Sequence, residues 1–138
     1  MRRLGILFSC LLLTGACTSR RPVSVAPGGR VIVLTDSLLR CGGRDTVRFG
    51  RLRSGEAVVS RLWFENRTAQ PVVFASVVRS CGCTSLSYDA APLSPGEVRA
   101  VELTFDSRGE WGWQFRSIDL FFAGWPQPFR FFAEADVE

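Results

Sequence analysis

Apolar and polar residues alternate along most of this chain, in short runs that end at turn-forming residues. In an extended strand this alternation places every second side chain on the same face, so that one face can be buried. In one run Leu62 and Phe64 share a face, and in another Ile118 and Leu120 do so. The pattern predicts strands at residues 46–51, 57–65, 71–79, 84–88, 97–106, 113–122 and 128–137, and residues 30–35 fit a further short strand. No segment shows sustained helical periodicity.

The breaks between these runs have the chemistry of tight turns. Ser54-Gly55, Pro95-Gly96 and Ser107-Arg108-Gly109 supply residues that readily adopt turn conformations. Seven short strands separated in this way predict an all-β, immunoglobulin-like β-sandwich with seven strands. We place this domain at residues 46–138.

The N-terminus has the pattern of a secretory signal. Arg2 and Arg3 precede an uncharged run, and small residues then lead directly into Cys17. The run is shorter than the ~20 apolar residues of a transmembrane helix. The cysteine at the cleavage point resembles the lipobox of bacterial lipoproteins, which predicts a signal peptide at residues 1–16 and diacylglycerol on the Cys17 thiol. Residues 17–45, which include Cys41, would then form a tether and an irregular lead-in.

A lipid on Cys17 predicts a location in the bacterial cell envelope, with the domain facing the periplasm and the membrane as a partner. Thr18 and Ser19 follow the cysteine, whereas an aspartate there is associated with retention in the inner membrane. The outer membrane is therefore favoured.

The composition argues against most enzyme classes. The chain has no histidine, and all 17 of its basic residues are arginine. A Ser-His-Asp or Cys-His nucleophile and a lysine Schiff base are therefore excluded within this chain. Arg2 and Arg3 contribute two of the net charge of +4, so the mature chain carries about +2, too little to argue for a nucleic-acid partner. No cofactor is expected.

One short motif stands out after the third expected strand, Ser80-Cys81-Gly82-Cys83-Thr84. Around it the chain carries Phe64-Glu65-Asn66 before the motif and Leu93-Ser94-Pro95-Gly96-Glu97 after it. This order resembles the bacterial family known as domain of unknown function 1573, over about residues 46–137. The resemblance implies a secreted or lipid-anchored protein whose fold is related to the ASH and major-sperm-protein-like immunoglobulin folds. The molecular function of that family is not established.

The two cysteines of the motif allow three kinds of chemistry. An oxidising compartment favours a structural disulfide. A redox role needs a nearby cation to lower a thiol pKa, and only Arg79 is adjacent in sequence. Two thiolates could hold a soft ion such as Cu(I), but the chain supplies few further ligands, so we predict no metal site. Glycine between Cys81 and Cys83 would relieve the backbone strain of closing a small ring.

The pairing depends on how far Cys41 lies from the motif. If the strands run alternately up and down, Cys41 and the motif lie at opposite ends of the sandwich. Cys41 lies five residues before the first expected strand, and each residue spans at most about 3.3–3.6 Å, so a bridge to the motif would have to stretch along the sandwich. We favour a Cys81–Cys83 disulfide, or both thiols reduced, with Cys41 unpaired.

The same alternation of strand direction predicts where two of the tryptophans lie. It places the turn that contains Trp111 and Trp113 at the end of the sandwich where the motif lies. Exposed aromatic residues beside a cluster of loops commonly mark a binding surface. The two side chains could equally cap the core.

These features support two main hypotheses of function. The first is a non-catalytic, lipid-anchored interaction or structural module with a partner protein in the envelope. The second is thiol–disulfide exchange or copper handling through Cys81-Gly82-Cys83. Carbohydrate binding by loop tryptophans is a weaker third hypothesis, because no acidic or amide cluster accompanies them.

Overall fold

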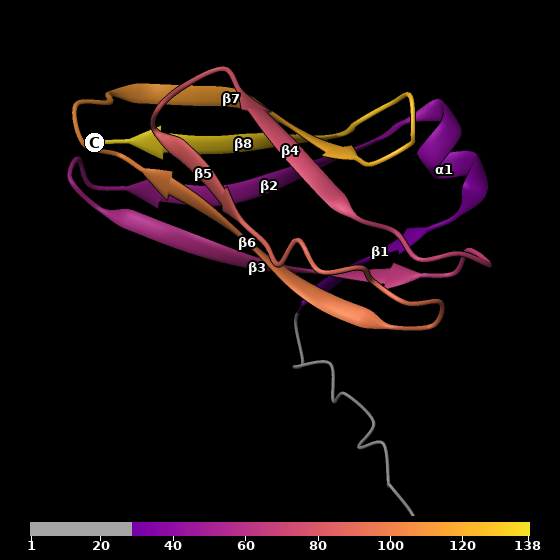
Figure 1. Ribbon diagram of the computed structural model, residues 1–138. Helices are drawn as coiled ribbons and strands as arrows, with labels where there is room; N and C mark the ends of the chain where they lie inside the picture. Colours follow the sequence, from indigo (N-terminus) through magenta and orange to yellow (C-terminus); the bar gives the residue numbers. More distant parts are fainter. Residues whose placement is uncertain (1–28) are drawn as a thin grey trace, which may run out of the picture.

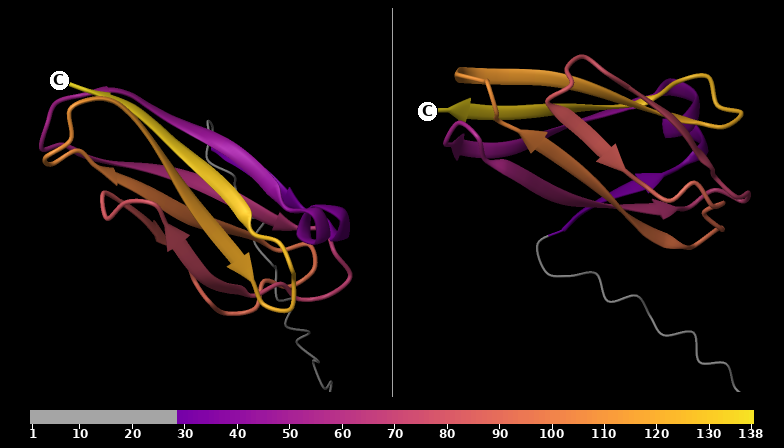
Figure 2. Two further views of the ribbon diagram at one scale, coloured as in Figure 1. Left: turned by 90° about the horizontal axis from the view of Figure 1, so that it is seen from above. Right: turned by 60° about the vertical axis from the view of Figure 1, so that its left-hand side comes forward.

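Residues 29–138 are described by a computed structural model of the chain, in which two four-stranded sheets pack face to face (Figures 1 and 2). Sheet A has the strand order β1-β3-β6-β5, and sheet B has the order β2-β8-β7-β4. The strands are β1 (Arg30–Leu34), β2 (Gly43–Leu52), β3 (Ala57–Asn66), β4 (Phe74–Arg79), β5 (Thr84–Ser87), β6 (Val98–Asp106), β7 (Gly112–Phe122) and β8 (Phe129–Val137). The predicted all-β, immunoglobulin-like sandwich is confirmed.

The core lies between the sheets and is formed by the alternating apolar residues of the strands. Phe64 on β3 is fully buried at its centre. Its ring meets four other phenylalanine rings at steep angles, with centroid distances of 5.3 to 6.4 Å, namely those of Phe74, Phe122, Phe129 and Phe131. Since edge-to-face contacts add to the free energy of burial, Phe64 joins both sheets into one core.

Two features of the N-terminal part correct the sequence analysis. β1 pairs in parallel with β3, from Arg30 opposite Leu62 to Leu34 opposite Asn66, so the sandwich has eight strands and begins before residue 46. A short helix, α1 (Asp36–Cys41), occupies part of the expected irregular lead-in. Six residues are too few to show helical periodicity, which is why the pattern analysis missed it.

Local signals for α1 are nevertheless present in the sequence. The backbone N–H of Leu38 donates to the side-chain oxygen of Thr35, the N-cap residue, at 3.2 Å. Gly42 ends the helix with a φ of 81°, a conformation that glycine adopts without steric cost. The helix buries Leu39 completely against the core. This cap chemistry, and not periodicity, defines the element.

The strands alternate in direction along the chain, and β5–β6 and β7–β8 are consecutive neighbours within a sheet, but other consecutive strands are not. β2 and β3 are consecutive in sequence and lie in different sheets, as do β4 and β5. The connections β2–β3, β4–β5 and β6–β7 all lie at one end of the sandwich, opposite α1 (Figure 1). A simple up-and-down order, in which consecutive strands are neighbours in a sheet, is therefore wrong for these pairs. The end of the sandwich at which each turn lies is predicted correctly, because it depends only on the alternating direction of the strands.

Asn66 holds two loops at the α1 end. Its side chain is fully buried and forms hydrogen bonds to Thr68, Gln70 and Leu93. Its backbone carbonyl accepts from the Gly96 N–H at 2.6 Å, in the turn before β6. The Glu97 carboxylate closes that turn by accepting from the Ser94 backbone N–H, and this bond, together with Arg99, holds its pKa below the usual value.

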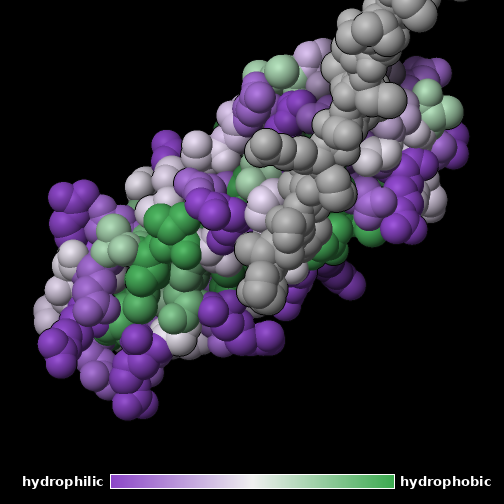
Figure 3. Space-filling view, turned by 90° about the horizontal axis from the view of Figure 1, so that it is seen from below, coloured by the Kyte–Doolittle hydropathy of each residue, from purple (hydrophilic) through white to green (hydrophobic). Residues whose placement is uncertain are grey.

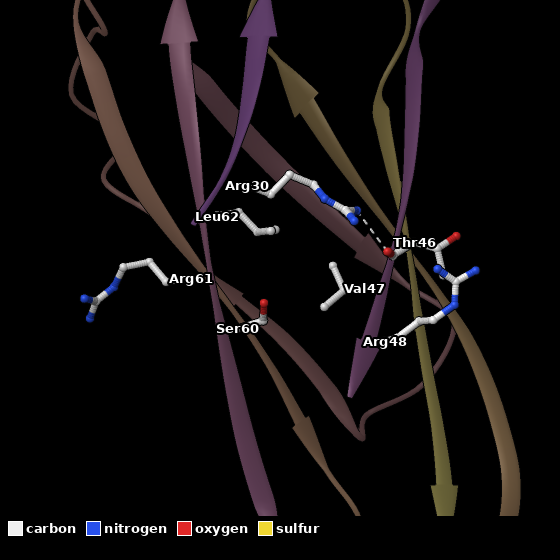
Figure 4. Close-up of a pocket in the computed structure, with 7 residues that line it drawn as sticks. All are labelled: Arg30, Thr46, Val47, Arg48, Ser60, Arg61 and Leu62. Atoms are coloured by element: carbon white, nitrogen blue, oxygen red, sulfur yellow. Dashed lines mark hydrogen bonds between the residues drawn. The ribbon is translucent and has the colours of Figure 1, made fainter. Parts of the chain in front are cut away.

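One open side of the sandwich is bridged by an arginine. Arg30 on β1 reaches across to sheet B, where it donates to the Thr46 carbonyl at 3.1 Å and pairs with Asp45 (Figure 4). Behind it the side chains of Val47 and Leu62 point toward each other from the two sheets. Because Arg61 and Arg48 extend away from this opening, Arg30 is the side chain that spans it.

The outer face of sheet A carries a stretch of apolar side chains bordered by hydrophilic ones (Figure 3). Val59 on β3 is the most exposed aliphatic side chain among residues 29–138, at 59%. In the same part of the chain, no helix has the length and apolar character needed to cross a membrane.

Candidate functional site

The Cys81-Gly82-Cys83 segment crosses from sheet B to sheet A, because it joins β4 to β5. Cys81 and Cys83 form a disulfide, with Cα atoms 5.2 Å apart, and both are half-buried. Cys41 is exposed and unpaired among residues 29–138, and it lines a hollow with Gln127 and Pro128 at the opposite end of the sandwich. The structure therefore keeps Cys41 apart from the motif. Cys17 lies outside the described residues.

Hydrogen bonds tie the motif to the strands on both sides. The Ser80 N–H donates to the Ser117 carbonyl at 3.0 Å, and the Ser117 N–H donates to the Ser80 hydroxyl at 2.9 Å. The Cys83 carbonyl accepts from the Asp106 N–H at 2.8 Å. Thr84, which is buried, donates its hydroxyl to the Cys81 carbonyl. The segment is thus fixed at both of its ends.

Gly82 is less constrained than the sequence analysis expects. It is not among the glycines with positive φ, and a methyl group added at its Cα would meet no atom within 4 Å. Neither backbone conformation nor close packing therefore requires glycine between the two cysteines.

Glu110, in the β6–β7 connection, is a neighbour of the disulfide that the sequence analysis missed. One carboxylate oxygen lies 3.9 Å from the Cys81 sulfur, and the other accepts from Arg116 at 3.0 Å. Potential ligand atoms of Cys81, Cys83 and Glu110 all lie within 4.8 Å of one another. In the reduced state these three groups could hold a soft or borderline cation. Only the packing of the β6–β7 connection against the motif reveals this.

The two predicted tryptophans follow Glu110 directly, since Trp111 ends the same connection and Trp113 is the second residue of β7. Trp111 is 69% exposed and Trp113 is 65% exposed, so neither caps the core. The Gln114 side chain is buried beneath them and donates to the Trp111 carbonyl at 2.7 Å. A rigid, hydrogen-bonded turn therefore presents both rings to solvent beside the motif.

Trp113 is the first ring of a stack that continues over the outer face of sheet B. Its ring lies parallel to that of Phe115, with centroids 5.4 Å apart, and Phe115 lies parallel to Phe132 on β8, with centroids 4.9 Å apart. The sequence analysis did not single out Phe115 or Phe132. Alternation with the buried Gln114 and Ile118 places Trp113 and Phe115 on one outward face, but only the β7–β8 register brings Phe132 beside them.

A family model described as "Protein of unknown function (DUF1573)" matches residues 43–137. None of the curated proteins matches the chain. The match begins with β2 and ends with the last residue of β8, and so covers all strands except β1.

Several solved structures share the fold. A protein of unknown function from Porphyromonas gingivalis W83 is 19% identical, with a TM-score of 0.56, over 66% of this chain and 43% of that one. The VesB protease of Vibrio cholerae is 19% identical, with a TM-score of 0.55, over 67% of this chain and 30% of that one. This chain spans less than half the length of either structure, so the likeness concerns the sandwich domain alone.

Proposed function

This chain belongs to the family described as protein of unknown function (DUF1573), and we propose that it is a lipid-anchored bacterial envelope protein whose sandwich is a non-catalytic binding module. The leader pattern and Cys17 support the anchor. The domain would face the periplasm, and the residues after Cys17 favour the outer membrane. Binding would take place on the aromatic side of sheet B, away from the core.

The observation that carries this proposal is the exposure of a continuous group of aromatic rings. Trp113 and Phe115, 65% and 41% exposed, are stacked on the outer face of a sheet whose core is complete without them. Trp111, which precedes β7 and lies two residues before Trp113 in the sequence, is exposed as well. Large aromatic side chains grouped at the surface of a soluble domain commonly mark an interaction site, and such residues supply much of the binding energy of interfaces.

Binding to isolated cell envelopes tests the proposal. Residues 18–138 lack Cys17 but keep the whole core, which runs from Ile32 to Val137, so binding cannot come from a lipid on Cys17. We expect this protein to sediment with the envelopes. Trp113→Ala is expected to weaken binding about tenfold, because loss of a central aromatic residue at an interface typically costs more than 1 kcal/mol.

Val59→Ala is the matched control for that substitution. Val59 is similarly exposed but lies on the opposite sheet, so its loss should leave binding unchanged. The proposal is wrong if the protein does not bind envelopes, or if the two substitutions weaken binding equally.

The position of the disulfide supports a second candidate, thiol–disulfide exchange. Cys81 and Cys83 are half-buried in a connecting segment, and the Glu110 carboxylate lies 3.9 Å from Cys81. During reduction by a dithiol, one thiolate attacks a sulfur, the Cys81–Cys83 bond breaks, and the second thiol of the donor completes a new disulfide. The product is a pair of thiols in this chain, which take up the two protons that the donor dithiol loses, and the Glu110 carboxylate could pass one of these protons from the donor to Cys81.

Alkylation and peptide mapping of protein taken directly from envelopes tests this second candidate. For exchange, we expect a mixture of reduced and oxidised Cys81 and Cys83, and Glu110→Gln should slow reoxidation of the reduced pair. Arg61→Gln, on the far sheet, is the control. A closed disulfide in every molecule, with both variants reoxidising as the unmodified chain does, would assign the motif a structural role.

A further inference from the structure

A shallow groove follows β8 along the outer face of sheet B. It consists of three adjoining hollows with volumes of about 410, 470 and 270 Å³. Arg44 and Phe132 line both the first and the second hollow, and Arg48 lines both the second and the third. The three hollows therefore follow one another from the α1 end, near Cys41, to Trp113 at the end where the motif lies.

One side of the groove is formed by arginines of β2, and its charge is uneven. Arg44 and Arg48 of β2, together with Arg30 of β1, line the second hollow, where Asp45, the partner of Arg30, is the single acidic residue. Arg44 has no acidic partner among residues 29–138, whereas Arg48 pairs with Glu134 at 3.3 Å in an exposed ion pair. Exposed pairs of this kind contribute little free energy, so Arg48 can exchange Glu134 for another anion.

The third hollow has a different character. It is lined by Arg48 and Arg51 on one side and by Glu134 and Asp136 on the other, so its charges balance. Trp113 forms its aromatic wall. The positive charge of the groove is thus concentrated in the first two hollows, toward α1.

The other side of the groove is formed by the stacked rings. The centroids of Trp113, Phe115 and Phe132 are spaced by 5.4 and 4.9 Å, and neighbouring planes are within 13° of parallel. Since carbon atoms in contact lie about 3.5–4.0 Å apart, the rings are offset. Phe115 is stacked on both of its faces, whereas Trp113, at the end of the stack, has one face without a stacked aromatic neighbour among residues 29–138. One side of the groove therefore offers regularly spaced aromatic side chains, and arginines line the opposite side.

We propose that this groove binds an extended strand of an anionic polysaccharide. This inference rests on the proposed binding function and names its ligand class. A pyranose ring presents a flat face of C–H groups, which is attracted to the electron-rich face of an aromatic ring. Acidic groups on the same sugars accept paired hydrogen bonds from guanidinium groups such as that of Arg44. Only a polymer with both features matches both sides of the groove.

Two other kinds of ligand fit the groove less well. The floor strand β8 is paired with β2 on one side and β7 on the other, so a peptide strand lying on it would find no free backbone groups to pair with. An anionic membrane surface is held by clusters of about 4–8 basic residues, whereas Arg44 is the one arginine of this groove without an acidic partner among residues 29–138. A polysaccharide strand can direct an acidic group to Arg44 and the face of a sugar ring to Trp113, so that its charges need not face Glu134 and Asp136.

Calorimetric titration of polygalacturonate into residues 18–138 tests the inference, with uncharged dextran as the comparison. We expect polygalacturonate to bind at least tenfold more tightly than dextran and to bind more weakly as salt is raised. Arg44→Gln and Phe115→Ala should each weaken binding by about tenfold. The matched controls, Arg61→Gln and Val59→Ala on sheet A, should leave it unchanged.

Failure of this inference can be told apart from failure of the binding function. If envelopes bind the protein in a Trp113-dependent way, but polygalacturonate neither binds nor competes, the polysaccharide is excluded and the binding module stands. Equal binding of dextran and polygalacturonate, or equal losses in the groove and control variants, would also overturn the inference. If neither envelopes nor polygalacturonate bind, both proposals fail.

Discussion

Replacing Phe64 with alanine is expected to lower the free energy of unfolding by about 4 kcal/mol, the largest effect we predict for a single substitution. The Phe64 side chain is fully buried, and its ring contacts phenylalanines of β4, β7 and β8 across the core. Its removal loses the transfer free energy of the ring and leaves a cavity where the two sheets meet. Edge-to-face contacts, each contributing about 0.5–1.5 kcal/mol, are lost as well.

Urea denaturation followed by circular dichroism measures this effect. Phe115→Ala is the matched control, because Phe115 is 41% exposed on the outer face of sheet B, and its loss should cost less than about 1 kcal/mol. Phe64→Leu keeps part of the volume and should cost about 1–2 kcal/mol, so it remains measurable if the alanine variant does not fold. Equal costs for Phe64→Ala and Phe115→Ala would show that the core does not centre on Phe64.

Asn66→Ala is expected to destabilise the domain by about 3 kcal/mol. The buried amide donates to the carbonyls of Gln70 and Leu93, both at 2.8 Å, and its oxygen accepts from the N–H and the hydroxyl of Thr68 at 2.9 and 2.8 Å. Alanine leaves the buried N–H of Thr68 without a partner and removes one of the two hydrogen bonds that each of the Gln70 and Leu93 carbonyls accepts. Unsatisfied buried groups cost more than the net contribution of the hydrogen bonds themselves.

Two further variants show whether the Asn66 side chain is the cause. Gln70 contributes only its backbone carbonyl and N–H to this network, so Gln70→Ala should change the free energy of unfolding by less than about 0.5 kcal/mol. Asn66→Asp keeps the acceptor oxygen but loses both donated bonds and adds a buried charge, so it should destabilise the domain at neutral pH. A cost for Gln70→Ala equal to that for Asn66→Ala would contradict this account.

The hydrogen bonds of Asn66 explain why this residue and the Pro-Gly-Glu turn stand out in the sequence. Asn66 follows the buried alternation of β3, and its backbone carbonyl accepts from Gly96 in the Ser94–Glu97 turn. The asparagine and the Pro-Gly-Glu turn, which supported the family resemblance, therefore meet in one loop-closing network. Their role is in stability, and they lie at the α1 end, opposite the Cys81-Gly82-Cys83 segment.

Much of the fold could be predicted because strand alternation and turn chemistry are local properties. Leu62 and Phe64 showed the buried face of β3 without knowledge of its neighbours, and alternating strand direction placed Trp111 and Trp113 at the end where the motif lies. The helix α1 was missed because its signals are a cap and a glycine rather than a period. The parallel pairing of β1 with β3 joins segments about thirty residues apart, which local patterning does not report.

The same distinction between local and long-range properties applies to the candidate sites. The sequence by itself determined which residues alternate, where the chain turns, and that Cys81 and Cys83 stand one residue apart. Only the tertiary structure decided that Glu110 lies beside Cys81, that Phe132 completes the stack begun by Trp113, and that the arginines of β2 face those rings across β8. Each of these contacts joins residues from different strands or turns, and its geometry is fixed by sheet register and packing, which depend on the whole core rather than on any one segment.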